Sequence, residues 1–414
     1  MLVVALIALL WALDRLFTPP DTNRTAGWPS VVWVMMGLLV FTQVWIGLQL
    51  LFDLSVNSYQ TFHYFLLGVT YSLFFFLIIA LFNTRARVVW LVGALVLSGT
   101  LQAFIGISRV LGELSWLSEL LGLPLAGGTA SGSFVNRNHF AGYLEMTLAL
   151  GIGLMLALRT GEGWSLRALL SLLLSQKVVI RLALIVMVIG LVMSQSRMGN
   201  MAFMLSLLIV GSVFVLTLPT HRLRNGLILL SILLIDVLVI SQYFGLERLK
   251  DRIVSTDVSI SLEQGQLVLN VDDLRALAWE QAQPLANENA LTGVGAGGYE
   301  VAFMPYAGLA FGGHFDHAHH DYLQFFIELG LLGFIPLLLF VLLALWHAVK
   351  ALTFHVSLFR SGLGVGVAMA IITIAIHSFS DFNLQIPANA LTFVTVCALA
   401  VLTLYHHRSK KRID

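Results

Sequence analysis

The chain has 414 residues, of which 58% are hydrophobic and only 11% are charged. Soluble domains carry about 25% charged residues, so this composition excludes an ordinary soluble protein and indicates one embedded in a lipid bilayer. The formal net charge of +1 excludes the basic footprint of a nucleic-acid-binding protein. The single cysteine, Cys397, excludes an intramolecular disulfide and makes a cysteine-based metal site implausible.

Apolar segments of the length that a membrane span needs, roughly 20 residues, recur along nearly the whole chain. The first segment lacks a basic n-region and an obvious cleavage site, so we interpret it as a span and not as a signal peptide. We therefore predict an all-α, polytopic membrane helix bundle of about eleven or twelve transmembrane helices with one long extramembrane loop. The expected spans are 1–16, 30–51, 63–83, 87–108, 138–159, 178–195, 199–218, 224–243, 322–346, 363–379 and 388–405.

The hydropathy pattern divides the chain into four parts. Residues 1–130 hold the N-terminal transmembrane helices, and residues 131–243 hold spans that carry asparagine and arginine motifs at their ends. Residues 244–321 form the long loop with short helices, and residues 322–414 hold the last spans and a basic tail. Within the loop, an alternating pattern predicts a short hairpin that turns at Gln264 and Gly265.

The distribution of charge orients the predicted bundle. When the long loop is placed outside, most of the 23 lysines and arginines fall on the cytoplasmic side, as the positive-inside rule requires. An odd number of spans then puts the N-terminus outside, which a first span missing from this chain would explain. The basic residues on short outer loops, which have no topological role there, are Arg109, Arg137 and Arg197.

Two of these arginines lie in polar motifs beside spans. In "GSFVNRNHFAGYLEM" (132–146), Arg137 precedes Asn138, which we expect to cap the following helix. A plain helix cap with interface anchors is the alternative interpretation. In "SQSRMGNMAF" (194–203), the turn is so short that Arg197 sits almost in the membrane. An ionisable residue there is a functional candidate, and snorkelling to the interface is the alternative.

The segment "VDDLRALAWEQAQPLANENALTGVGAGGYE" (271–300) carries the chemistry of the long loop. Asp272 or Asp273 predicts the start of a helix that runs to about Ala286. Arg275 and Trp279, four residues apart, share a face of that helix. The glycines that follow fit G-x-G-x-x-G, but they follow a helix and not a strand, so we reject a dinucleotide site. We expect them to form a tight turn near a ligand or another helix.

The stretch "HFDHAHHDYLQFFIELG" (314–330) crowds four histidines and two aspartates at the start of a span. The HAHH spacing invites a zinc site, but no matching ligand motif appears elsewhere on the outer side. A polar helix cap is a second alternative, and it is the only role we give to His314. We favour acid–base chemistry, since histidine exchanges protons near neutral pH. Acidic residues in or beside spans are costly unless they face a polar cavity, and we expect this of Glu145, Glu328 and Asp381.

These residues together predict a class of reaction. Arginine binds phosphate through a planar fork that stays charged, so two arginines on the outer face can hold a diphosphate and stabilise it as it leaves. A neutral histidine beside them can take the proton from an attacking hydroxyl. The predicted reaction is glycosyl transfer from a lipid-diphosphate sugar donor at the outer leaflet, without a metal ion.

The order of the motifs resembles the O-antigen ligase family, which includes O-antigen ligases, O-antigen polymerases and protein O-oligosaccharyltransferases. The resemblance covers residues from 131 to 390, whereas the first 130 residues contribute only hydropathy. The segments that carry it are "NRNHFAGYL", "SQSRMG", a loop of the form R…W…P…GVGAGGY, "HAHHDYLQFFIELGLLG" and "HSFSDFNLQIPANA".

The resemblance implies a glycosyltransferase of the GT-C class that works without metal or cofactor, at the periplasmic face of the bacterial inner membrane. His319 matches the family's essential histidine, implied to activate the acceptor hydroxyl. Arg197 and Arg275 match the basic residues that bind the donor diphosphate. The family usually has asparagine after the key histidine, where this chain has His320, a departure that affects the hydrogen bonding of His319. The further residues that we expect to contact substrate are Arg137, Asn138, His320 and Asp321.

The implied donor is an undecaprenyl-diphosphate-linked glycan. The acceptor is lipid A-core, a growing glycan or a protein hydroxyl, and the lipid bilayer is the other expected partner. Ligase, polymerase and protein O-oligosaccharyltransferase activities differ only in acceptor, so the sequence leaves them open, with a modest preference for the ligase. A secondary transporter is a remoter alternative that predicts inverted repeats and paired broken helices. A non-catalytic lipid-binding subunit would need no histidine base.

Overall fold

The computed structural model describes residues 1–17, 28–112, 128–158, 176–217, 226–227, 230, 261–263, 266–268, 271–307, 315–354 and 357–406. Within these ranges, eight helices are long and apolar enough to cross a membrane, and shorter apolar stretches lie at Leu2–Asp14 and Val178–Met193. The helices are α1 (Leu2–Phe17), α2 (Ser30–Leu51), α3 (Ser58–Leu81), α4 (Arg85–Val110), α6 (Arg137–Ala157), α8 (Gln176–Met193), α9 (Arg197–Thr217), α12 (Val271–Glu288), α13 (Tyr299–Phe303), α14 (Asp321–Leu352), α15 (Leu358–His377) and α16 (Pro387–Tyr405).

These helices confirm the predicted all-α membrane bundle. Every expected span overlaps a helix except the one at 224–243, which lies almost entirely outside the described residues. The predicted loop helix is present as α12, and the predicted hairpin is also present, as strands β1 (Ser261–Glu263) and β2 (Gln266–Val268). The strands pair antiparallel, with Glu263 opposite Gln266.

The chain folds into two compact units that interleave along the sequence. The first unit comprises Met1–Leu77, Leu246–Leu342 and Ser378–Phe382. The second unit comprises Ile78–Gly245, Leu343–His377 and Asn383–Asp414. The four-part division that hydropathy suggests stays a prediction.

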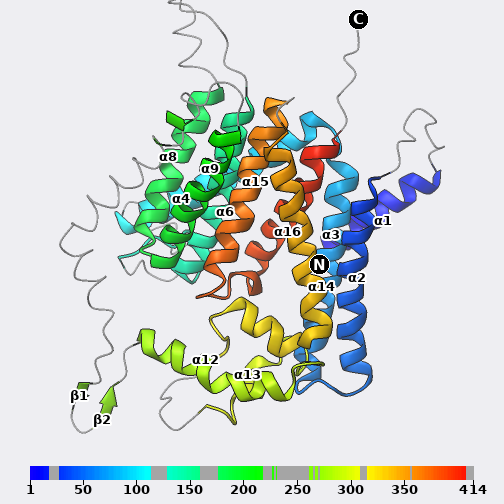
Figure 1. The fold of residues 1–414 in the computed structure, drawn as a ribbon, viewed down its shortest axis with the longest axis vertical. Helices are drawn as coiled ribbons and strands as arrows, with labels where there is room; N and C mark the ends of the chain where they lie inside the picture. The colour runs from blue at the N-terminus through cyan, green and yellow to red at the C-terminus, as the bar shows by residue number, and fades with distance from the viewer. Residues whose placement is uncertain are drawn as a thin grey trace, which may run out of the picture. The chain divides into compact units, whose positions relative to one another are not determined.

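In the second unit, α6 lies among α4, α8, α9 and α15 (Figure 1). The 18-residue apolar window of α6 is completely buried, as expected for a helix that is apolar on all sides. Small residues let it approach α15 closely, since a Cβ atom added at Gly153 would lie 2.7 Å from the Cα atom of Gly366. This small-residue packing is characteristic of helix contacts in membranes, where hydrophobic burial between helices adds little.

In the first unit, α12 and α13 pack against the beginning of α14 (Figure 1). Their shared core contains Ala278 and Ala282 of α12, Tyr299 and Phe303 of α13, and Ile327 of α14. The residues of the histidine-rich stretch that the structure describes lie beside this core, because Ala318 is part of it and Phe315 packs against it. The loop helices therefore position the N-terminal end of α14 and the residues just before it.

Candidate active site

Helix α14 is interrupted at Gly330, whose φ of 61° and ψ of −175° are not helical. The interruption takes the carbonyl groups of Ile327, Glu328 and Leu329 out of the regular helical pattern of hydrogen bonds. Each accepts another bond: from the Val294 amide at 3.0 Å, from the Gly295 amide at 3.0 Å and from Nε1 of Trp45 at 2.8 Å, respectively. Unpaired backbone groups cost several kcal/mol in a membrane, so these partners are what allows a broken helix here.

The glycine-rich loop supplies two of those partners. Gly293, Gly295 and Gly297 have φ values of 71°, 96° and 71°, which side-chain-bearing residues rarely adopt. A Cβ atom at Gly293 would collide with the backbone of Glu328. This confirms that the glycines form a tight turn against another helix.

Buried Glu328 joins this loop to the histidine-rich stretch. Its Oε2 atom accepts the Gly297 amide at 2.9 Å, and its Oε1 atom accepts Nε2 of Gln324 at 3.0 Å. The same Gln324 nitrogen lies 3.0 Å from Nδ1 of His317. The sequence predicts that Glu328 faces a polar cavity, whereas in the structure both of its carboxylate oxygens accept hydrogen bonds from protein groups.

His319 lies two residues before the start of α14 and has a left-handed backbone, with a φ of 50°. Its Nδ1 atom is 4.0 Å from Oδ1 of the buried Asp381 and has no hydrogen-bond partner among the residues that the structure describes. Burial, together with the positive charge of Arg275, lowers the pKa of His319 to about 4, although Asp381 and Asp316 oppose the shift. The ring is therefore a neutral base around pH 7, with 21% of its side chain exposed.

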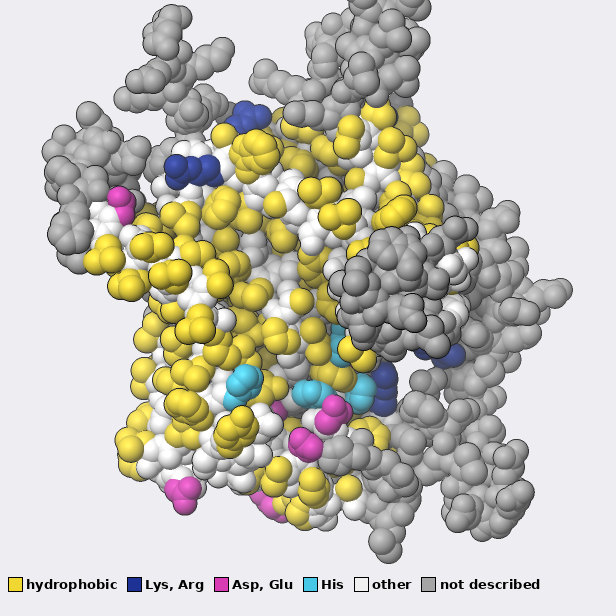
Figure 2. Space-filling view, turned by 180° about the vertical axis from the view of Figure 1, so that it is seen from behind, with side chains coloured by type: hydrophobic (Ala, Val, Ile, Leu, Met, Phe, Trp, Pro, Cys, Tyr) yellow, Lys and Arg dark blue, Asp and Glu magenta, His cyan; other side chains and the backbone are white. Residues whose placement is uncertain are grey.

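Arg275 and Trp279 lie on one face of α12, as predicted. Arg275 contacts the segment that contains Asp381, and Trp279 contacts the residue that precedes His319. Arg275 is partly buried and donates from Nη1 to the carbonyl of Ser380 at 2.8 Å. Nε1 of Trp279 donates to the carbonyl of Ala318 at 2.7 Å. Figure 2 shows histidine side chains close to acidic and basic ones in one area of the surface. The structure thus brings Arg275 and His319 into one cluster.

His320 and Asp321 have structural contacts that account for much of their polarity. His320 accepts the Leu323 amide at Nδ1, at 3.2 Å, which caps the start of α14. Burial lowers the pKa of His320. Asp321 is buried and accepts the Ser378 hydroxyl at 2.8 Å. Their expected contact with substrate stays a prediction.

Arg137, Asn138 and Arg197 belong to the second unit. The cap of α6 is Asn136, whose side chain accepts the Asn138 amide at 2.8 Å. The prediction that Asn138 is the cap is therefore wrong, because that residue already lies in the first helical turn. Arg137 and Arg197 are both exposed, and their roles in binding substrate stay predictions.

The turn before Arg197 is compact and polar, as the sequence indicates. Gln195 has a φ of 54°, and the hydroxyl of Ser194 accepts the amide of Ser196 at 3.1 Å. The third outer arginine, Arg109, is buried and donates to the carbonyl of Gly132. Arg109 therefore stabilises a loop of the second unit.

Sequence reasoning missed Gln324 and Phe382. Gln324 is buried and connects His317, Ala318 and Glu328. Its signal was the four-residue spacing from Glu328, which places two polar side chains on the same face of an apolar helix. Phe382 contacts the rings of both His317 and His319, and one more aromatic residue in a membrane protein gives no such signal.

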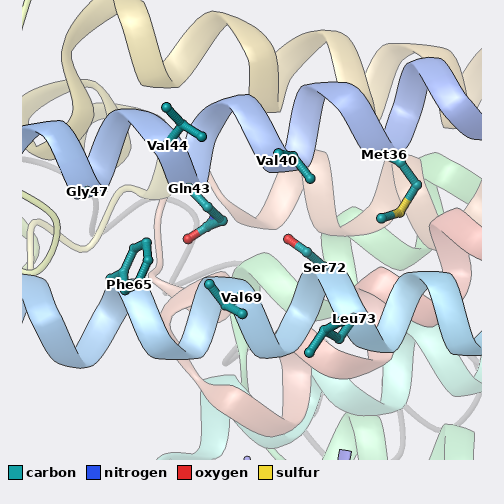
Figure 3. A pocket seen from close by; sticks show the side chains of 9 residues that line it. All are labelled: Met36, Val40, Gln43, Val44, Gly47, Phe65, Val69, Ser72 and Leu73. Carbon is teal, nitrogen blue, oxygen red and sulfur yellow. The ribbon is translucent and has the colours of Figure 1, made fainter. Parts of the chain in front are cut away.

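The structure does not favour two other kinds of site among the described residues, a metal centre and an apolar groove with acid–base chemistry. Among the described residues, which do not include His314, no group of three or more His, Cys, Asp or Glu side chains is arranged to hold a metal ion. A groove of about 360 Å³ lies between α2 and α3 (Figure 3). Only Gln43 and Ser72 among its lining side chains are polar, so it has no group that can exchange protons.

Comparison with known proteins yields one family. The sequence profile of the family described as O-antigen ligase matches residues 182–340. No curated protein matches the chain. The matched region includes Arg197, Arg275, His319 and the break in α14, and it excludes Arg137, Asn138 and Asp381.

Proposed function

Residues 182–340 match the O-antigen ligase family, and on this premise we propose that the chain transfers a glycan from an undecaprenyl-diphosphate carrier to an acceptor hydroxyl. The observation that carries the proposal is the cluster of Arg275 and His319 at the start of α14. It pairs a permanent cation with a neutral imidazole, the two groups that such a reaction needs.

His319 acts as the base in this proposal. Its lowered pKa, about 4, leaves the ring unprotonated at neutral pH. The ring takes the proton of the acceptor hydroxyl while that oxygen attacks the anomeric carbon. The bond between the anomeric carbon and the phosphate oxygen breaks, and its electron pair leaves with the diphosphate. The charge of the bound diphosphate favours the imidazolium, so donor binding makes His319 a stronger base.

Arg275 acts on the leaving group. One of its N–H groups donates to the carbonyl of Ser380, which fixes the direction of the guanidinium. A guanidinium has five donors, so others can meet the diphosphate oxygens while negative charge develops on them. Asp381, 4.0 Å from the His319 ring, is a positioning residue that favours the imidazolium once it forms.

Single substitutions test the proposal. Purified His319→Ala and Arg275→Ala variants are assayed with a polyprenyl-diphosphate glycan in the presence of a chelator, with His63→Ala, at an exposed histidine of α3, as the matched control. We expect both site variants to lose at least about a hundredfold in kcat/KM, the usual scale of a general base or an electrostatic group. Full activity of His319→Ala would exclude the base, and activity that depends on a divalent ion would exclude the metal-free mechanism.

The same assay tests the predictions for other residues and for the acceptor. Arg197→Ala and Arg137→Ala test whether these arginines also bind the diphosphate, and such a loss would be expressed mainly in KM. A glycan on lipid A-core identifies a ligase, a longer lipid-linked glycan identifies a polymerase, and a modified protein identifies an O-oligosaccharyltransferase.

A further inference from the structure

Gln324 sits at the centre of a hydrogen-bond network that the proposed reaction does not use. Its side chain is buried in the second turn of α14. Oε1 accepts the amide of Ala318 at 3.1 Å, whereas Nε2 lies 3.0 Å from Oε1 of Glu328 and 3.0 Å from Nδ1 of His317. Three groups are thus tied to one amide.

The orientation of the Gln324 amide follows from these neighbours. The backbone N–H of Ala318 can only donate, so the atom that faces it must be the amide oxygen. The opposite orientation would set two donors against each other at Ala318 and two oxygen atoms against each other at Glu328. The NH₂ group therefore faces both Glu328 and His317.

This orientation decides where His317 carries its proton. An NH₂ group only donates, so Nδ1 of His317 must accept, and the neutral ring then carries its hydrogen on Nε2. The ring is fixed in direction as well, because it stacks on Phe382 at 4.1 Å with an angle of 21° between the planes. The ring of His317 is thus held in one orientation, and the contact of its Nδ1 atom with Gln324 makes Nε2 the donor atom.

His317 and the base share their surroundings. The edge of the His319 ring meets the same Phe382 ring, at 4.8 Å and 78°. Ala318, the residue between the two histidines, is held on both sides: Gln324 binds its amide and Trp279 binds its carbonyl. A group bound at His319 therefore lies beside His317.

We propose that Gln324 is a positioning residue that holds His317 as the Nε2–H tautomer, and that His317 donates this hydrogen bond to an oxygen of the glycosyl donor or acceptor. This deepens the proposed function and rests on it. The ligand class is an oxygen acceptor, either a sugar hydroxyl or a phosphate oxygen.

An exchange of residues separates polarity from packing. In Gln324→Glu, two carboxylates face each other and His317 loses its NH₂ partner. In the double variant Gln324→Glu with Glu328→Gln, the new carboxylate accepts from Ala318 and from the new amide at 328. That amide still accepts from Gly297. Every hydrogen bond made by residue 324 is restored, but Nδ1 of His317 must now donate, so in the neutral ring its Nε2 atom becomes an acceptor.

We expect Gln324→Glu to lose thermal stability and activity. The double variant should regain the melting temperature of the parent but keep a kcat/KM about tenfold to a hundredfold lower, the scale of one hydrogen bond to substrate. His317→Phe keeps the stack on Phe382 but leaves one N–H of Gln324 without its acceptor, so it should show a similar loss of kcat/KM together with a lower melting temperature. Gln283→Glu, at an exposed position of α12, is the matched control and should change neither quantity.

Nitrogen NMR of protein labelled at histidine reads the tautomer without any turnover. The parent should show hydrogen on Nε2 of His317, and the double variant should show it on Nδ1. Hydrogen on Nδ1 in the parent, or full recovery of kcat/KM in the double variant, would overturn the inference. If His319→Ala is fully active while the tautomers are as expected, the proposed function fails and the positioning role of Gln324 stands.

Discussion

At the scale of single residues, the backbone conformation and the surroundings of His319 determine its chemical properties. Its left-handed backbone, at φ 50°, is uncommon for a residue with a side chain and costs of order 1–3 kcal/mol. The conformation persists because Ala318, its neighbour, is bound by both Gln324 and Trp279. A strained backbone that surrounding contacts hold in place is typical of functional sites.

The acid limb of the pH profile follows from the pKa of His319. Since that pKa is lowered to about 4, we expect kcat/KM to hold well below pH 6.5 and to fall only near pH 4. Arg275 lowers the pKa and Asp381 raises it. Arg275→Gln should therefore shift the titration of His319 to higher pH, and Asp381→Asn should shift it to lower pH.

NMR titration of the histidine ring in each variant checks these directions independently of activity. Equal titration curves for the parent and Arg275→Gln would show that the guanidinium does not act on the ring. The Asp381→Asn variant keeps the size of the side chain, so its shift reports charge and not a cavity.

At the scale of elements, the break in α14 links the site to the membrane helices. Gln49 of α2 donates to the carbonyls of Thr292 and Glu328, at 2.7 and 2.9 Å. Trp45 of α2 binds the carbonyl of Leu329. Broken helices are tolerated at membrane depth only where protein satisfies the freed backbone groups, and α2 performs this role together with the glycine loop.

Gly330→Ala should destabilise the protein. The left-handed φ of 61° disfavours a side chain, and the added Cβ atom would collide with the backbone of Leu291. We expect a loss of about 1–3 kcal/mol, seen as a lower melting temperature in detergent. Gly37→Ala, where an added Cβ meets nothing within 4 Å, should be neutral or slightly stabilising. Equal effects of the two substitutions would contradict a special conformation at Gly330.

The packing of α6 on α15 contains a buried polar contact. Glu145 accepts from the Thr373 hydroxyl at 2.9 Å and lies 2.8 Å from Nδ1 of His377. Glu145→Ala should cost about 3–5 kcal/mol, because it removes the partner of a buried polar group. Glu145→Gln still offers an acceptor to Thr373 and a donor to His377, so its melting temperature should lie much closer to that of the parent. Equal melting temperatures for the two variants would exclude a stabilising role for these bonds.

At the scale of the whole molecule, this is a multi-pass membrane protein of two interleaved compact units. The orientation inferred from the basic residues places the histidine cluster outside, which we propose is the periplasmic side of a bacterial inner membrane.

Chemical labelling tests that orientation. The only cysteine, Cys397, is buried, so an introduced cysteine gives a clean signal. Asp316→Cys, at an exposed residue beside the site, should react with a membrane-impermeant maleimide added to cells whose inner membrane is intact. Arg360→Cys, expected on the opposite side, should react only after that membrane is opened. The reverse pattern would invert the proposed topology.

The sequence by itself determined the membrane class, the helices and the chemical character of the site. Apolar length decides a span almost alone, because lipid offers the backbone no hydrogen bonds. The acid–base character of histidine and the resemblance to the O-antigen ligase family singled out His319, and the same resemblance singled out Arg275. These properties belong to local segments, so a sequence displays them.

Only the tertiary structure decided how distant residues act together. Asp381 approaches His319, Trp45 and Gln49 bind the broken end of α14, and Gln324 fixes His317. The N-cap of α6 is Asn136 and not Asn138, because the helix begins where the backbone turns, and the local composition does not determine that position. Each contact joins segments far apart along the chain or depends on one rotamer or dihedral. These distances and dihedral angles result from tertiary packing, and the hydropathy pattern of the sequence contains no information about them.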